Sequence, residues 1–190
     1  MKSVKLVLMA SACLIAACQK NDTSSDTATN DQSVGTDNMA IDNDAATTTN
    51  TSGGNVDASF VKDALEGDNG EVAIGNLAAT KASSQAAKDF GKMLAADHAA
   101  HKEKVAALAS SAGVTVSDEP SPEGEENLRK LQGLSGAAFD KAFKQAMIDD
   151  HQKDIAKYEK QASSGDPQTS ALAKDTLPTL RKHLETAQSL

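Results

Sequence analysis

From Asp57 to its last residue, the chain is built from helix-forming residues whose apolar positions recur every three or four residues. This period matches the turn of an α-helix, and no stretch of useful length shows the alternation that is typical of a β-strand. The pattern predicts four long helices and, between the second and the third, a polar connection with a short amphipathic helix. We place the long helices at about 58–82, 84–111, 136–162 and 167–189, and the short one near 123–132. The expected fold class is therefore all-α, a four-helix bundle with one long connection.

The expected helix ends carry residues that stabilise such ends. Asp57 stands where its side chain can accept a hydrogen bond from the first free backbone N–H groups, and Asp166 followed by Pro167 repeats this start for the last helix. The segment 67–70, Gly-Asp-Asn-Gly, is a turn signal within the first helix. Because the apolar spacing continues through it, we expect one continuous helix. Pro178 lies inside the last helix and is expected to kink it.

Residues 1–17 have the pattern of a bacterial lipoprotein signal peptide. Lys2 and Lys5 form a positive start, and the apolar run that follows is too short for the ~20 residues that a membrane-spanning helix needs. The run ends Leu-Ile-Ala-Ala-Cys, which resembles a lipobox with Cys18 as the acylated residue. Cys13 fits this motif less well, because an alanine occupies the place of the branched aliphatic residue. The alternative is an ordinary signal peptide followed by a chance cysteine.

Acylation of Cys18 would anchor the exported chain to a membrane, which is the one partner that the sequence indicates. By resemblance to lipoprotein sorting rules, the glutamine at position 19 indicates the outer membrane of the bacterial cell envelope, with the domain facing the periplasm. The segment 18–56 is rich in Asn, Asp, Thr and Ser and has few apolar residues, so we expect a disordered tether. The sequence thus predicts three parts: a signal peptide over 1–17, an acylated cysteine with its tether over 18–56, and a helical bundle over 57–190.

The charge balance of the chain is acidic. It has 19 Lys and Arg residues against 27 Asp and Glu residues, a formal net charge of −8. A nucleic-acid-binding protein needs a clustered basic face that replaces the counterions of the phosphates, so nucleic acid is not an expected partner. With no Trp, one Tyr and four Phe, the core must consist mostly of Ala, Leu, Val, Ile and Met.

Ionisable residues interrupt the apolar faces of the expected helices at similar depths. Glu71 lies near the midpoint of the first long helix, His98 near that of the second and His151 near that of the third. Midpoints of helices of equal length share a layer in a bundle whichever way the helices run, so we expect these side chains to meet in the core. His183 is expected about one turn away. His101 falls in the same arc of its helix as His98.

The second and third long helices also share a short repeat. The spacing Phe-x3-Leu-x2-Asp-His at 90–98 matches Phe-x3-Met-x2-Asp-His at 143–151. Two helices that present the same Asp-His pair at the same depth suggest a pseudo-symmetric site. In this interpretation Asp97 and Asp150 orient neighbouring imidazole rings.

The cluster has two interpretations. In the first, Glu71, His98 and His151 form a buried, hydrogen-bonded polar layer that fixes helix register in a structural or binding module. Buried histidines more often have this role than they bind metal. In the second, the same three side chains bind one divalent transition metal such as Zn, Fe, Cu or Mn, with His101 or His183 completing the ligand set. The sequence leaves both interpretations open.

Two enzyme classes fit the sequence less well. Di-iron oxidoreductases built on bundles use a Glu-x-x-His spacing on two helices, whereas Ala95 and Ile148 occupy the positions where the two glutamates would stand. A hydrolase would need an activated Ser or Cys beside a base, and no serine lies in a Gly-x-Ser-x-Gly turn. We therefore assign no catalytic residue.

Several motifs of the expected bundle occur together in one known family. They are Phe60, Glu71, Met93-x3-Asp97-His98, Gly136-x2-Phe139-Asp140, His151 and Leu177-Pro178-x4-His183. Over about 57–190 the chain resembles the bacterial exported proteins grouped as domain-of-unknown-function family 4142, whose members are described as outer membrane proteins. The resemblance implies a ferritin-like four-helix bundle and implies no established activity.

Overall fold

The computed structural model describes residues 56–164 and 166–190, and this part of the chain is helical, with no β-strand. Its helices are α1 (Ala58–Lys81), α2 (Gln85–Ser111), α3 (Pro122–Gln132), α4 (Gly136–Ala162) and α5 (Pro167–Ser189). The four long helices and the short α3 confirm the all-α bundle expected from the sequence. The predicted signal peptide 1–17, Cys18 and nearly all of the tether 18–56 lie outside the described residues. Among the helices described, none is both long and apolar enough to cross a membrane.

Side chains at the helix starts explain where the helices begin. Asp57 accepts a hydrogen bond from the Phe60 N–H at 3.0 Å, and Asp166 accepts one from the Gln168 N–H at 2.9 Å, as expected for helix caps. The second carboxylate oxygen of Asp166 accepts the Asp57 N–H at 2.8 Å, which ties the starts of α1 and α5 together. The turn signal in 67–70 does not interrupt α1.

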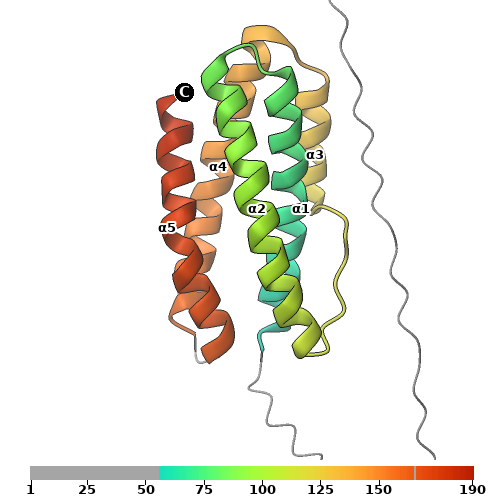
Figure 1. Cartoon of the computed structure of the whole chain (residues 1–190), viewed down its shortest axis with the longest axis vertical. Helices are drawn as coiled ribbons and strands as arrows, with labels where there is room; N and C mark the ends of the chain where they lie inside the picture. Colours follow the sequence, from blue (N-terminus) through green and yellow to red (C-terminus); the bar gives the residue numbers. More distant parts are fainter. Residues whose placement is uncertain (1–55, 165) are drawn as a thin grey trace, which may run out of the picture. The chain divides into compact units, whose positions relative to one another are not determined.

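One connection between helices runs along the length of the bundle. α1 and α2 form one antiparallel hairpin and α4 and α5 another, while the connection that carries α3 leads back along the bundle to the start of α4 (Figure 1). α2 and α4 therefore run parallel: Phe90 packs on Phe143, and further along both helices His98 lies level with His151. A single long crossover is the connection found in ferritin-like bundles. α5 continues through Pro178 as one helix.

The apolar core is divided into two clusters, and every long helix contributes to both. The upper core lies toward the α1–α2 turn and includes Ile74, Leu94, Phe139, Phe143 and Met147. The lower core lies toward the α4–α5 turn and includes Val61, Leu65, Val105, Tyr158 and Leu180. Between the two cores, each long helix presents ionisable side chains, so the waist of the bundle is a polar layer.

α1 and α2 approach each other closely through two glycines. A Cβ atom at Gly75 would lie 2.6 Å from the Gly91 carbonyl oxygen, and one at Gly91 would lie 2.7 Å from the Gly75 carbonyl oxygen. These separations are shorter than van der Waals contact, so a side chain at either position would push the helices apart. The glycine pair sets the spacing of α1 and α2 on the upper-core side of the polar layer.

The crossover is fastened to α1 before α3 begins. The Asn69 side-chain amide donates to the Ser117 and Glu119 carbonyl oxygens at 3.3 and 3.1 Å. The Ser121 N–H donates to the Glu66 carbonyl oxygen at 3.1 Å. These contacts hold the start of α3 beside the middle of α1, next to the polar layer.

Candidate metal centre

The polar layer between the two cores holds five buried ionisable side chains. Asp68 and Glu71 come from α1, and each is at most 3 % exposed. His98 comes from α2, His151 from α4 and His183 from α5, with exposures of 6 %, 1 % and 0 %. Burying such groups is costly unless each of them finds a partner. Their contacts therefore indicate what the layer can do.

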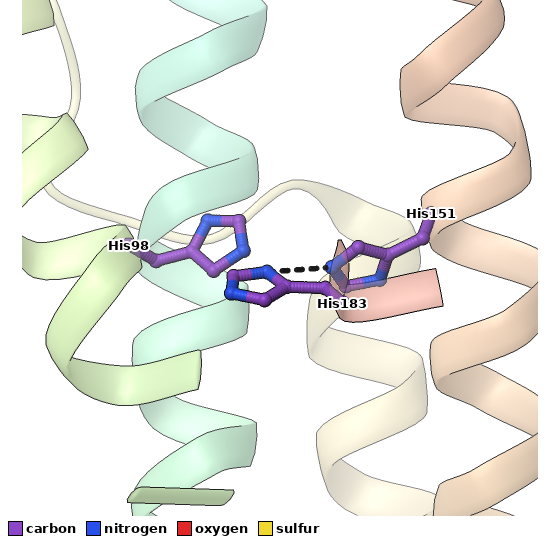
Figure 2. Close-up of side chains that lie close together, drawn as sticks. All are labelled: His98, His151 and His183. Carbon is purple, nitrogen blue, oxygen red and sulfur yellow. Dashed lines mark hydrogen bonds between the residues drawn. The ribbon is translucent and has the colours of Figure 1, made fainter. Parts of the chain in front are cut away.

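Three of these side chains converge on one point. One ring nitrogen from each of His98, His151 and His183 lies within 4.8 Å of the other two (Figure 2). His151 Nε2 and His183 Nδ1 are 3.2 Å apart. In four-coordinate zinc sites with bonds of about 2.0–2.1 Å, the ligand nitrogens are separated by about 3.3 Å. The His151–His183 pair already has this spacing, and His98 lies within reach of it.

The ring nitrogens that point away from this centre are each held by an oxygen acceptor. The contacts are 2.9 Å long and join His98 Nδ1 to Asp68 Oδ1, His183 Nε2 to Asp97 Oδ2 and His151 Nδ1 to the Met147 carbonyl oxygen. Carboxylate and carbonyl oxygens accept hydrogen bonds, so each of these nitrogens carries the ring hydrogen and donates it. The other nitrogen of each ring then presents a lone pair to the centre.

Three lone pairs therefore face one another in a buried space. Within the described part of the chain, His98 Nε2 has no hydrogen-bond partner. A second proton on one ring would relieve the arrangement, but burial and the nearby charges of His98 and His183 lower the pKa of His151 from 6.5 to about 3. Burial also lowers the pKa of His183, although its hydrogen bond to Asp97 opposes the shift. His151 and His183 are therefore neutral at neutral pH, and with the unpartnered His98 Nε2 the three rings offer three nitrogen donors to a cation.

The structure brings together His98 and His151, the two histidines expected to share a layer, and adds His183 at the same level rather than a turn away. Glu71 lies in the same layer but not at the same centre. Its Oε1 is 3.9 Å from His151 Nδ1, on the side of the ring opposite the nitrogen that faces His183. The His151 ring thus lies between Glu71 and His183.

Asp97 and Asp150, which the repeat paired with neighbouring imidazoles, lie in different surroundings. Asp97 accepts the hydrogen bond of His183 from the last helix, while the adjacent His98 donates to α1. Asp150 lies with Glu71 at a cavity between α1, α3 and α4. The repeat in sequence therefore does not correspond to a repeat in contacts.

Asp68 is the member of the layer that sequence reasoning did not assign. Its carboxylate accepts from His98 and also from His101, whose Nδ1 lies 2.8 and 3.0 Å from the two Asp68 oxygens. Asp68 precedes Glu71 by three residues and so shares its face of α1, which is the signal that could have identified it. The turn signal in 67–70 conceals this periodicity. His101 contacts the same carboxylate as His98 but stands outside the three-histidine group.

A small cavity of about 30 Å³ adjoins the three-histidine group. His98 and His183 line it, together with Asp68, His101 and Tyr158 among others. One water molecule fits a space of this size. A set of three histidines beside such a space resembles open zinc sites, in which water or substrate takes the fourth position.

The sequence profile of one family, described as Domain of unknown function (DUF4142), matches residues 42–190. The chain belongs to this family, as the motifs of its bundle predicted. Comparisons with curated proteins and with solved structures gave no match. Family membership assigns no activity, so the function has to be argued from the geometry of the site.

Proposed function

We propose that this chain binds one divalent transition-metal ion in the waist of its bundle through His98 Nε2, His151 Nε2 and His183 Nδ1. Imidazole suits zinc, copper, iron and nickel, and the facing helices of a bundle are a common place for such ligands. The observation that carries the proposal is the set of three outward N–H groups, each bonded to an oxygen acceptor. This arrangement turns three lone pairs toward one another.

The same contacts argue against a purely structural polar layer. A structural layer stabilises a bundle by pairing each buried donor with an acceptor. Here acceptor faces acceptor, because neutral His151 and His183 present two lone pairs 3.2 Å apart. His98 Nε2 adds a third without a hydrogen-bond partner among the residues described. Such an arrangement is unfavourable by itself and favourable around a cation.

The oxygen acceptors would support the bound metal by holding the rings. A hydrogen bond from the outer N–H to a carboxylate or carbonyl fixes the tautomer and orientation of the imidazole and raises the basicity of its other nitrogen. Asp68 does this for His98 and Asp97 for His183. Loss of such a partner commonly lowers metal affinity about 10- to 100-fold.

The proposal extends to where the protein works. The charge, length and lipobox pattern of residues 1–18 support an envelope lipoprotein attached through acylated Cys18. The function would then be metal binding by a membrane-tethered bundle. The space beside His98 and His183 has room for one small fourth ligand.

Metal content of the purified full-length protein tests the histidine centre. After metals are removed with a chelator and Zn²⁺ is supplied, the wild type is expected to retain one equivalent and to melt at a higher temperature. At a free Zn²⁺ concentration of 100 times the Kd, binding adds about 2.7 kcal/mol to the free energy of unfolding. His98→Ala and His183→Ala are each expected to lose the bound zinc.

His101→Ala is the matched control. It removes an imidazole from the same helix and from the same Asp68 carboxylate, but that imidazole stands outside the three-histidine group. This variant is expected to retain the zinc. A wild type that retains no metal, with His98→Ala and His183→Ala merely melting at lower temperature, would favour the structural layer instead.

A further inference from the structure

A second cavity lies beside Glu71, between α1, α3 and α4. Its volume is about 470 Å³, and six carboxyl groups line it: Asp63, Glu66 and Glu123, and three more, those of Glu71 of α1 and of Asp150 and Asp154 of α4. We refer to the last three as the inner carboxyl groups. The first residues of α3, around Gly124, form part of the opposite wall.

Glu71 is the unusual member of this lining. It is 1 % exposed, yet neither of its carboxylate oxygens has a hydrogen-bond partner in the described ranges. The ring nitrogen beside it, His151 Nδ1, is 3.9 Å away and already donates to the Met147 carbonyl oxygen. A buried carboxylate in this situation is unfavourable unless it takes up a proton or binds a cation.

The lysines that line the same cavity do not supply that cation. Lys153 pairs with Glu123 of α3, and Lys157 lies 3.8 Å from Asp63 of α1. In the part of the chain that the structure describes, neither lysine forms an ion pair with an inner carboxyl group. Within the described ranges the inner carboxyl groups therefore face one another with no lysine at ion-pair distance, and Lys157 acts on Asp154 only from further away.

The pKa of Asp154 reflects the same conflict. Burial and then the neighbouring Asp150 carboxyl raise it to about 6. A cation among the three groups would lower this value, because an opposite charge favours the ionised form.

We propose that this cavity binds a hydrated divalent cation of the oxygen-preferring class, represented by Mg²⁺, Ca²⁺ and Mn²⁺, with the inner carboxyl groups as its protein ligands. Such ions take six or more oxygen ligands and commonly keep several waters. Each water needs roughly 30 Å³, so an ion that keeps several waters besides its carboxyl ligands fits the cavity of about 470 Å³.

This site differs from the three-histidine centre in position and in ligand chemistry. Glu71 lies on the Nδ1 side of the His151 ring, whereas His183 lies on the Nε2 side. Carboxylate oxygens suit magnesium, calcium and manganese, whereas imidazole nitrogens suit zinc and copper. The cavity site therefore does not depend on metal binding by the histidines.

Titration of the purified full-length protein with Mn²⁺ tests this site, followed by the decrease in the electron paramagnetic resonance signal of the free ion. Running the titration on wild type and on His98→Ala in parallel separates the two centres. We expect one equivalent of bound Mn²⁺ in both proteins, with displacement by Ca²⁺. Glu71→Gln and Asp154→Asn are expected to bind Mn²⁺ at least about tenfold more weakly, since each removes one ligand charge.

Asp149→Asn is the matched control. It removes one negative charge from α4, the helix that carries Asp154. Asp149 accepts a hydrogen bond from the Gln145 side chain and does not line this cavity. Its Mn²⁺ affinity is expected to equal that of the wild type. Circular dichroism checks that each variant is folded, and Asp154→Asn keeps the test decisive if Glu71→Gln does not fold.

Three results would overturn the proposal. Unchanged affinity in folded Glu71→Gln or Asp154→Asn would exclude the inner carboxyl groups as ligands. Equal weakening in Asp149→Asn would indicate diffuse attraction to an acidic surface. Loss of the Mn²⁺ equivalent in His98→Ala would show that the ion binds at the histidines. Failure of zinc binding in the wild type, with Mn²⁺ binding intact, would refute the histidine centre and leave the cavity site standing.

Discussion

At the residue scale, buried imidazole and buried carboxyl groups share one layer, and folding shifts their pKa values in opposite directions. Burial, reinforced by the charges of His98 and His183, lowers the pKa of His151 from 6.5 to about 3. Between pH 6.5 and about pH 3, His151 is protonated in the unfolded chain but not in the folded one. The contribution of His151 to stability is therefore lost as the pH falls. Burial and Asp150 raise the pKa of Glu71 well above 4.5. Above pH 4.5 and up to this raised pKa, Glu71 is protonated in the folded chain but not in the unfolded one. The contribution of Glu71 to stability is therefore lost as the pH rises.

Glu71→Gln isolates the carboxyl effect. In metal-free buffer, the free energy of unfolding of the variant relative to wild type is expected to increase as the pH rises from 4.5. The increase should be about 1.4 kcal/mol for each unit by which folding raises the Glu71 pKa. Urea denaturation at a series of pH values measures it, with Asp149→Asn as the control for removal of an exposed charge. Parallel stability curves for wild type and Glu71→Gln would contradict the burial of an uncompensated carboxyl group.

Sequence predicted part of the layer for a simple geometric reason. His98 and His151 lie near the midpoints of helices that are both 27 residues long, so the midpoint rule places them at one level. His183 escaped this rule because it lies well past the middle of α5 (Pro167–Ser189), so the midpoint of this helix lies at another level. Asp97 accepts the hydrogen bond of His183 because of its side-chain rotamer and because α2 and α5 are neighbours. The helical spacing of a sequence predicts neither of these.

At the scale of the helices, the ends were predictable and the contacts were not. Asp57 and Asp166 are local signals, because a capping side chain bonds the backbone only two or three residues further on. Gly75 and Gly91, taken singly, are residues that weaken a helix. The two glycines allow close contact only once α1 and α2 pack together, so no local sequence pattern predicts this role.

Gly75→Ala tests the close approach of α1 and α2. The added methyl group would meet the Gly91 carbonyl oxygen at 2.6 Å and the Ala95 backbone nitrogen at 2.8 Å. The helices must separate, and we expect the free energy of unfolding to fall by about 1–3 kcal/mol. Chemical denaturation measures the change.

Gly67→Ala, in the same helix, is the control for helix propensity. A Cβ atom there meets no atom of the described residues within 4 Å. This variant is expected to be more stable than wild type by about 0.5–1 kcal/mol, because alanine favours the helix over glycine. A similar effect of both substitutions would show that α1 and α2 are not limited by the glycine contact.

At the scale of the whole molecule, the sequence indicated one long connection but not where it leads. A connection of this length could return to the same end of the bundle or cross to the other. The crossing depends on contacts between distant residues, such as Phe90 with Phe143 and Asn69 with the Glu119 carbonyl oxygen. Such pairings are cooperative properties of the assembled core, so they were visible only in the structure.

Attachment of the whole molecule to a membrane is predicted to depend on Cys18. Cys18→Ser is expected to abolish metabolic labelling with fatty acid and to move the protein from the membrane fraction to the soluble fraction. Cys13→Ser is the control and is expected to leave both properties unchanged, because the lipobox ends at position 18. Persistent labelling of Cys18→Ser would contradict the lipobox.

The crossover also bears on when an ion can enter the bundle. His98 belongs to the first hairpin, whereas His183 belongs to the final helix of the chain. A growing or translocating chain therefore delivers one ligand long before the last one, and three-point coordination has to wait for the C-terminus. The ion that fills the centre would then be selected by what is available where folding is completed, not where translation takes place.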